Sequence, residues 1–170
     1  MAHSTKKLGM MLTASGWILG ILLLVFAFTQ VLDRQHNPNQ SVSSVQSGTG
    51  QEIVLQRNRS GHYVFDGEIN HRKVTFLVDT GATTTAIPGE LQLDLGLKAG
   101  PATAVSTANG TTTAYLTRLD QLALGGIELS NVQASIIPGM KTNEVLLGMN
   151  VLKHFELVQR GNQLVIRQYR

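Results

Sequence analysis

A stretch of 25 residues without a charged side chain, 8–32, lies near the beginning of this 170-residue chain. As an α-helix it would be about 38 Å long, which is enough to cross the roughly 30 Å hydrocarbon core of a bilayer. A cleaved signal peptide is the alternative, but its apolar region is usually only about 7–15 residues long. No clean A-x-A cleavage site follows the stretch. The sequence therefore favours one transmembrane helix over 8–32, after a short tail, 1–7.

The few charges beside this stretch predict its orientation. Lys6 and Lys7 precede it, whereas Arg34 follows it next to Asp33. Positive charges flanking a membrane helix favour the cytoplasmic side, so we expect the tail 1–7 in the cytoplasm. The rest of the chain would then lie beyond the cytoplasmic face of the membrane.

Small residues in the same stretch share one helix face, because Gly9, Thr13, Gly16 and Gly20 are three or four positions apart. Gly16 and Gly20 form a GxxxG pattern, which lets two helix backbones approach closely. Glycine is common in membrane helices, so the pattern alone does not distinguish a helix pair from a single span. It gains weight if the rest of the chain has to dimerise.

The remainder of the chain divides into a polar segment, 33–52, and a longer part, 53–170. The polar segment has no apolar periodicity, so we expect it to be a flexible linker. The longer part alternates short apolar runs with turn signals and has the size of one domain. It is the expected folded region.

Composition and motif patterns exclude several functions. The chain contains no cysteine, so disulfides, thiolate metal sites and a cysteine nucleophile are ruled out. Its net charge is only +3 and it has no basic stripe interleaved with aromatic residues, so nucleic-acid binding is not expected. His62, His71 and His154 lack the spacing of metal ligands, and the serines and glycines lack nucleophile-elbow and phosphate-loop patterns. No metal or cofactor is therefore expected.

Most of the segment 53–170 has the pattern of short β-strands. Apolar runs flank the turn pairs Asn109-Gly110, Gly125-Gly126 and Gly161-Asn162, which predicts three hairpins. Another strand pair is expected at 62–69 and 73–78, and two short segments, 89–95 and 149–155, look helical. The sequence therefore predicts a mostly β domain, either a small barrel or a sandwich.

One acidic residue has an unusual setting. The apolar strand residues 76–78 run directly into Asp79, which is followed by Thr80 and Gly81. A carboxylate at the edge of an apolar core suits acid–base chemistry. Gly81 would allow a tight turn that presents it, and the Thr80 hydroxyl could hydrogen-bond neighbouring backbone. The alternative is an ordinary turn, in which Asp and Gly are also frequent.

Residues 76–82 resemble the Asp-Thr-Gly-Ala active-site loop of retropepsin-like aspartic peptidases. The segment Leu146-Leu147-Gly148 is similar to the second signature of that family, two apolar residues and a glycine before a short helix. A flap-like hairpin lies between the two motifs, with its tip at Ala108, Asn109 and Gly110. The resemblance covers 53–170, and the whole layout looks like that of bacterial membrane-anchored members of the family.

The resemblance implies a single-lobe, closed β-barrel with one or two short helices, and an endopeptidase activity without metal or cofactor. It implies that Asp79 is the catalytic carboxylate and that Thr80, Gly81 and Ala82 shape its loop. Leu146, Leu147 and Gly148 would support that loop, and the hairpin at 108–110 would cover the substrate.

A dyad of aspartates activates the attacking water in this family, yet the sequence has one Asp-Thr-Gly motif. The resemblance therefore implies a homodimer that contributes Asp79 from each copy at a two-fold axis. The expected partners are a second copy, a peptide or protein substrate, and the membrane. The expected location is the inner cell membrane, with the peptidase domain on the periplasmic or extracytoplasmic side.

Several positions depart from the family pattern. Thr83 and Met149 replace the acidic residue and the arginine that form an ion pair near the active site of retroviral members. Both charges are missing together, so neither is left unpaired. Ala82 stands where pepsin-like enzymes often have Ser or Thr, so a hydroxyl near the dyad is missing. The flap tip also has fewer glycines than is usual in the family.

Two alternatives to an enzyme remain open on the sequence. The same barrel could be a non-catalytic, membrane-anchored module that binds peptides or dimerises, because a fold does not determine a function. It could also be a structural subunit held in place by its membrane helix. The intact motif from Asp79 to Ala82 favours the enzyme, because a binding module has no need for an acid there.

Overall fold

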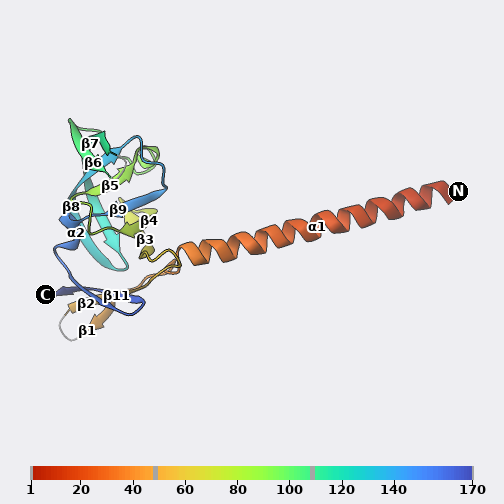
Figure 1. Cartoon of the computed structure of the whole chain (residues 1–170), viewed down its shortest axis with the longest axis horizontal. Helices are drawn as coiled ribbons and strands as arrows, with labels where there is room; N and C mark the ends of the chain where they lie inside the picture. The colour runs from red at the N-terminus through yellow and green to blue at the C-terminus, as the bar shows by residue number, and fades with distance from the viewer. Residues whose placement is uncertain (1, 48–49, 108–109, 170) are drawn as a thin grey trace. The chain divides into compact units, whose positions relative to one another are not determined.

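A computed structural model describes residues 2–47, 50–107 and 110–169 of the chain. The chain forms two units, Met1–Gln35 and His36–Arg170. The first unit consists of a single helix, α1, at Ala2–His36, drawn in red and orange in Figure 1. The second unit contains all the strands and two further short helices.

The helix α1 is long and apolar enough to cross a membrane. Within Gly9–His36, the most apolar 18-residue window has a mean hydropathy of 2.2, and none of that window is buried within the chain. Large apolar side chains such as Trp17 and Phe26 are exposed along it. A helix that is apolar on all sides belongs inside a protein core or in a membrane. The helix extends four residues beyond the predicted end at residue 32.

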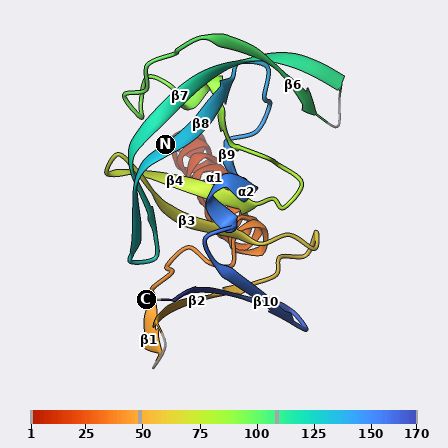
Figure 2. The same cartoon turned by 90° about the vertical axis from the view of Figure 1, so that its left-hand side faces the viewer.

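A closed β-barrel forms the larger part of the second unit. Its sheet has the strand order β3-β4-β9-β5-β8-β7-β6, and β3 also pairs with β7, so that six strands form a ring. The seven strands of this sheet are β3 (Val64–Ile69), β4 (Arg72–Val78), β5 (Thr85–Pro88), β6 (Ala102–Thr107), β7 (Gly110–Leu124), β8 (Ile127–Ile137) and β9 (Glu144–Leu147). Strand β6 pairs with β7 outside the ring, as the upper hairpin of Figure 2. The barrel expected from the family resemblance is confirmed.

The predicted hairpins form where short-range turn chemistry favours them. Gly125 and Gly126 both have positive φ, 55° and 99°, between β7 and β8. Asn70 and His71 do the same between β3 and β4, with φ of 49° and 61°. Two consecutive residues with positive φ make the turn whose twist matches that of paired strands. The β6–β7 hairpin is also present, but its predicted tip residues Ala108 and Asn109 lie outside the described residues.

The barrel encloses one apolar core. Phe65 and Phe76 stack inside it with ring centroids 5.4 Å apart, and both are fully buried. Leu119, Leu122 and Leu124 of the long strand β7 are also fully buried. Each such side chain contributes about 1.5–3 kcal/mol to the free energy of unfolding. The core therefore fixes the barrel that carries the loops described below.

A second, four-stranded sheet lies beside the barrel in the same unit, with the order β1-β2-β11-β10. Its strands are β1 (Val45–Ser47), β2 (Gly50–Gln56), β10 (Glu156–Arg160) and β11 (Gln163–Tyr169). The two short helices are the 3₁₀ turn η1 (Gly89–Leu91) and α2 (Met149–Leu152). Both fall at the start of the segments predicted to be helical, and both are shorter than expected.

The segment 33–52, expected to be a flexible linker, is instead largely part of the fold. Its first residues continue α1, and its last ones belong to β1 and β2. Asn39 is buried: its Nδ2 donates to the carbonyl oxygens of Gln56 and Val64 at 2.9 and 2.7 Å, and its Oδ1 accepts from the N–H of Gln56 at 2.7 Å. Asn37 is also buried and donates to Asp66. Polar side chains attach this segment to the domain. The apolar pattern of the sequence therefore did not indicate that the segment is folded.

Candidate active site

Asp79 is the first residue after strand β4, at the point where β4 ends beside the parallel strand β9. Its backbone N–H donates to the carbonyl oxygen of Leu147 at 3.1 Å, which ties it to the end of β9. Its side chain is partly buried, and its Oδ1 accepts the N–H of Gly81 at 2.8 Å. The carboxylate is therefore held in one orientation by the loop that follows it.

Gly81 has a different role from the one that the sequence suggested. Its φ lies outside the left-handed region, so the turn does not demand glycine for conformational reasons. A Cβ at this position would lie 3.2 Å from Oδ1 of Asp79, which is tighter than ordinary contact. A side chain at residue 81 would therefore crowd the carboxylate, which folds back over the glycine. The exposed Thr80 hydroxyl makes no hydrogen bond to another described residue, contrary to the expected contact with neighbouring backbone.

Gly148 joins the second predicted motif to the first. It stands between β9 and α2, and a Cβ there would lie 2.6 Å from the carbonyl carbon of Thr84 and 2.9 Å from the carbonyl oxygen of Ala82. The N–H of Met149 donates to that Ala82 oxygen at 2.7 Å, and the N–H of Asn150 donates to the Thr83 oxygen at 3.0 Å. The start of α2 therefore holds the Asp79 loop through these two main-chain hydrogen bonds. The structure brings the two predicted motifs into contact.

Asn150 also fixes this loop, and the sequence analysis did not identify it. Its Oδ1 accepts from the N–H and the hydroxyl of Thr85, at 2.8 and 3.0 Å, and its Nδ2 donates to the Gln133 carbonyl at 2.7 Å. Thr85 is fully buried at the start of β5, so its two donors depend on this partner. A polar residue in the first turn of a short helix gives no such indication in a sequence.

Backbone contacts join the loop to α2 at the positions where the family usually has an ion pair. Thr83 is exposed and takes part through its carbonyl oxygen. Met149 is partly buried and packs against the main core. The missing charges are therefore replaced by an apolar contact and by hydrogen bonds between main-chain groups.

Leu146 and Leu147 point to opposite sides of β9. Leu147 is fully buried in the main core. Leu146 packs instead against a small apolar cluster of Ala86, Ala114 and Ile137, which also receives Val105 and Met140. Val105 belongs to β6, so this cluster joins the β6–β7 hairpin to the strand that precedes Gly148. Gly110 begins β7 with φ of 105° and accepts the Thr107 hydroxyl through its carbonyl oxygen at 2.7 Å.

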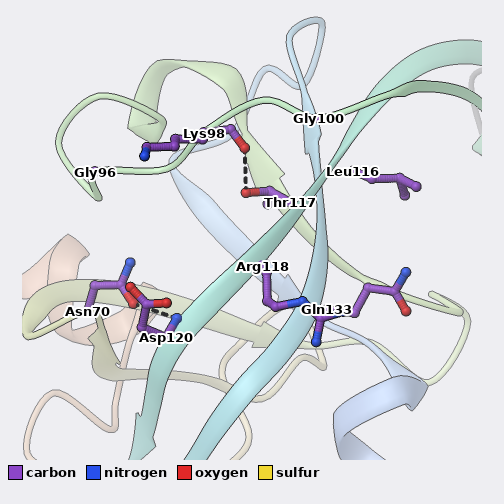
Figure 3. Close-up of a pocket in the computed structure, with 9 residues that line it drawn as sticks. All are labelled: Asn70, Gly96, Lys98, Gly100, Leu116, Thr117, Arg118, Asp120 and Gln133. Atoms are coloured by element: carbon purple, nitrogen blue, oxygen red, sulfur yellow. Dashed lines mark hydrogen bonds between the residues drawn. The ribbon is translucent and has the colours of Figure 1, made fainter.

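A shallow hollow of about 490 Å³ lies elsewhere on the domain, on the outer side of β7 and β8 (Figure 3). It is lined by Asn70, Gly96, Lys98, Gly100, Leu116, Thr117, Arg118, Asp120 and Gln133. Neither motif contributes a residue to it. Several of its polar groups already have partners within the domain, since Arg118 donates to Asn131 and Thr117 donates to the Lys98 carbonyl. The hollow is therefore separate from the candidate active site.

A closed six-stranded barrel with an Asp-Thr-Gly loop resting on a glycine and a short helix defines a retropepsin-like aspartic protease fold. The chain belongs to the family described as gag-polyprotein putative aspartyl protease, which matches residues 65–154. That range includes both motifs and the hairpin between them.

Three proteins similar to this chain come from bacteria. A retropepsin-like aspartic protease from Rickettsia conorii, known from a crystal structure, is 29% identical, with a TM-score of 0.60 over 75% of this chain and 95% of that one. An uncharacterized Sinorhizobium protein from the cobV 5′ region is 29% identical over 89% of this chain and 70% of its own length. An uncharacterized protein of Rickettsia prowazekii is 30% identical over 69% of this chain and 52% of its own.

Proposed function

We propose that this chain is a membrane-anchored aspartic endopeptidase that acts as a homodimer, with Asp79 from each copy forming the catalytic dyad. The observation that carries the proposal is the orientation of Asp79. Its carboxylate accepts the Gly81 N–H at 2.8 Å, while its backbone is tied to Leu147 in the second family motif. A carboxylate that only ended a turn would not need supports from both motifs.

The chemistry follows from two carboxylates at one axis. Two like charges in contact are unfavourable, so the pair shares one proton. The unprotonated member accepts a proton from a bound water, whose oxygen then attacks the carbonyl carbon of the peptide bond. The protonated member donates to the carbonyl oxygen as negative charge develops there. Collapse of the tetrahedral species breaks the C–N bond, and the leaving nitrogen takes up a proton from the dyad.

The apolar cluster beneath the β6–β7 hairpin, formed around Ala86, Ala114 and Ile137, supports a preference for apolar substrates. Val105, Met140 and Leu146 are only partly buried, although they pack on buried neighbours. When an apolar side chain of a substrate covers this exposed apolar area, both surfaces leave water, which favours binding. We expect peptides with an aliphatic or aromatic residue beside the cut bond to be preferred, and the hairpin tip at 108–110 to close over them.

The helix α1 would anchor the enzyme. Lys6 and Lys7 before the apolar segment support a cytoplasmic N-terminus and a peptidase domain on the extracytoplasmic side. In the single chain, nothing lies within 4 Å of a Cβ placed at Gly16 or Gly20. Their face is therefore free to pack against a second helix, which would raise the effective concentration of the two domains.

The test is cleavage of an unstructured peptide library by the full chain in detergent micelles, between pH 3 and 7. Asp79→Asn is the matched control, because an asparagine oxygen still accepts the Gly81 N–H and leaves the loop intact. Cleavage that is lost in the variant is the expected result. A folded dimer that cuts no peptide would instead support a non-catalytic binding module, and cleavage that survives in Asp79→Asn would exclude the proposed dyad.

A further inference from the structure

Residues 57–62, in the loop that joins β2 to β3, lie beside the point where the chain leaves α1. Nδ2 of the buried Asn58 donates to the carbonyl oxygen of His36 at 2.9 Å. His36 is the last residue of α1 and of the segment that is long and apolar enough to cross a membrane. The loop is therefore held at the residue where a membrane-spanning α1 would end.

Hydrogen bonds to Asn58 hold this loop from the inside. The side-chain oxygen of Asn58 accepts the N–H groups of Ser60 and His62 at 3.0 and 2.9 Å. Its backbone N–H donates to the His62 carbonyl oxygen at 2.8 Å. Arg57 and Arg59, on either side of the buried asparagine, are exposed. The loop therefore presents two arginines in a defined position.

The turn of the β10–β11 hairpin brings a third arginine to the same end of the four-stranded sheet. The N–H of Arg57 donates to the Asn162 carbonyl oxygen at 2.8 Å, and its Nη2 donates to the Asn162 side chain at 2.8 Å. Arg160 pairs with Gln163 across this turn and is exposed. Arg57, Arg59 and Arg160 are called the arginine cluster below.

Neighbouring segments offer little negative charge to the arginine cluster. Residues 37–51, which follow α1, contain no charged side chain. Two acidic side chains beside the start of this segment already have partners: Glu144 pairs with His36, and Asp66 accepts from Asn37 at 2.6 Å. The side chain of Arg57 bonds to an uncharged amide. The cluster is therefore suited to an anionic partner from outside the chain.

We propose that the arginine cluster binds the anionic headgroups of the bilayer that α1 crosses. The inference rests on the membrane anchor of the proposed function. Arg57 and Arg59 adjoin Asn58 in the chain, and adjacent Cα atoms are only about 3.8 Å apart, so both arginines lie close to His36. Anionic headgroups attract arginine within about a Debye length of the surface, roughly 8 Å at physiological salt.

An anionic bilayer fits the position of the cluster better than a separate acidic protein does. The covalent link to α1 keeps the bilayer beside residue 36, so binding to it is intramolecular and its effective concentration is high. A soluble partner would have to reach the same place by diffusion. The contact gives the domain a second attachment to the membrane, which restricts its motion about residue 36.

Quenching of a fluorescent label by lipid headgroups tests the contact in the full chain, reconstituted in vesicles. The natural sequence has no cysteine, so Ser60→Cys places a single label in the exposed loop beside Arg59. Leu93→Cys is the matched control, because Leu93 is 87% exposed and belongs to the far end of β3. There Asn70, which follows β3, donates to the Leu95 carbonyl at 3.1 Å. The six residues of β3 separate its two ends by roughly 20 Å, more than twice the Debye length.

Phosphatidylcholine vesicles with and without phosphatidylglycerol carry the same headgroup quencher. The label at residue 60 should be quenched more strongly when phosphatidylglycerol is present, and added salt should remove the difference because it screens the charges. The label at residue 93 should be quenched equally in both kinds of vesicle. Equal quenching at residue 60, or a phosphatidylglycerol effect of the same size at residue 93, would overturn the proposal.

Soluble polyglutamate, added to vesicles of phosphatidylcholine alone, tests the competing partner. A change in the emission of the label at residue 60, without any effect of phosphatidylglycerol, would assign the cluster to an acidic protein and overturn the lipid contact.

Charge-removing variants provide the second measurement. Arg57→Gln combined with Arg160→Gln removes two charges from the cluster and keeps polar side chains. An arginine near an anionic surface strengthens binding about fivefold, so the ratio of docked to undocked domain should fall by about tenfold or more. Arg72→Gln combined with Lys98→Gln is the control, because it removes the same charge from exposed residues at the far end of β3. Equal quenching for the two double variants would overturn the proposal, once urea unfolding has shown that both are folded.

Neither measurement involves peptide cleavage, so failure of the peptidase does not affect the result. Extraction with alkaline carbonate separates the headgroup contact from the anchor. A chain that stays in the vesicles without phosphatidylglycerol-dependent quenching excludes the contact alone. A chain that carbonate releases has no spanning helix, which overturns both the anchor and the contact.

Discussion

Gly148 and Thr84 lie so close together that a Cβ on the glycine would be 2.6 Å from the carbonyl carbon of the threonine. This contact joins the two sequence motifs of the site. The neighbouring atoms are backbone, so they cannot move aside as the end of a flexible side chain could. The position of the Asp79 loop therefore depends on the absence of a single methyl group.

The first prediction concerns this contact. Gly148→Ala should lower the free energy of unfolding by about 1–3 kcal/mol, because the added methyl forces the loop away from α2. It should also reduce peptide cleavage by more than the loss of folded protein explains. Urea denaturation together with activity of the folded fraction checks both. Gly139→Ala is the control, since nothing lies within 4 Å of its added Cβ and it should leave both quantities unchanged.

A second prediction concerns Asn150. Asn150→Ala leaves the N–H and the hydroxyl of the buried Thr85 without their acceptor, which should cost about 1–3 kcal/mol of unfolding free energy. Asn150→Asp keeps the acceptor for Thr85 but sets a carboxylate oxygen against the Gln133 carbonyl, so it tests the second contact separately. Thermal or urea unfolding of the three proteins gives the order directly. An alanine variant as stable as the natural chain would contradict the role assigned to this side chain.

The third prediction follows from the segment before β1. Asn39 makes hydrogen bonds to the backbone of both Gln56 and Val64, so Asn39→Ala should destabilise the domain by about 1–3 kcal/mol. A residue in a flexible linker would have no such effect. The exposed Asn143→Ala tests whether the loss is specific to buried asparagines. Equal stability of Asn39→Ala and the natural chain would restore the linker interpretation.

A fourth prediction concerns the shared dyad. Specific activity in detergent should fall on dilution, because a monomer holds only one of the two active-site aspartates. When equal amounts of Asp79→Asn and natural chain exchange partners at random, activity should fall to about half, since mixed dimers carry one carboxylate. Activity that neither dilution nor the variant chain alters would show that one copy is sufficient.

The fifth prediction concerns the membrane helix. Gly16→Leu combined with Gly20→Leu should lower the crosslinking yield of the full chain in lipid vesicles several-fold, because the bulky side chains separate the helix backbones. The change leaves the isolated helix undisturbed, as there is open space at both positions. Ala14→Leu with Ile18→Phe adds bulk to the opposite face and serves as the control. Equal yields from the two double variants would argue against a glycine-mediated helix pair.

Local features of the fold could be predicted from the sequence, because they depend on a few adjacent residues. Gly125 and Gly126 adopt the positive φ that their hairpin needs, and the end of β4 at Asp79 follows from an apolar run that meets a turn. The two short strands β5 and β9 were not predicted as strands. Their pairings with β8 and β4 are parallel and distant in sequence, and four residues carry little periodicity.

The supports of the site were harder to predict than its reactive group. Asp79 and Gly148 could be identified because a resemblance marks both positions. The side chains of Asn150 and Asn39 act through hydrogen bonds to backbone groups. Such a role depends on which backbone groups the folded chain brings near them. A single sequence contains no record of that proximity. The polar composition of 33–52 therefore suggested a linker where the structure has a hydrogen-bonded part of the domain.

The central position of β11 has a consequence for how the protein is made. Strand β2 emerges from the ribosome early, yet its partner β11 is the last described strand to be synthesised, and the register joins Gln56 to Gln163. Almost the whole domain must be translated before this sheet can close. Contacts between segments so distant in sequence form slowly. The order of synthesis thus delays closure of this sheet until translation of the domain is nearly finished.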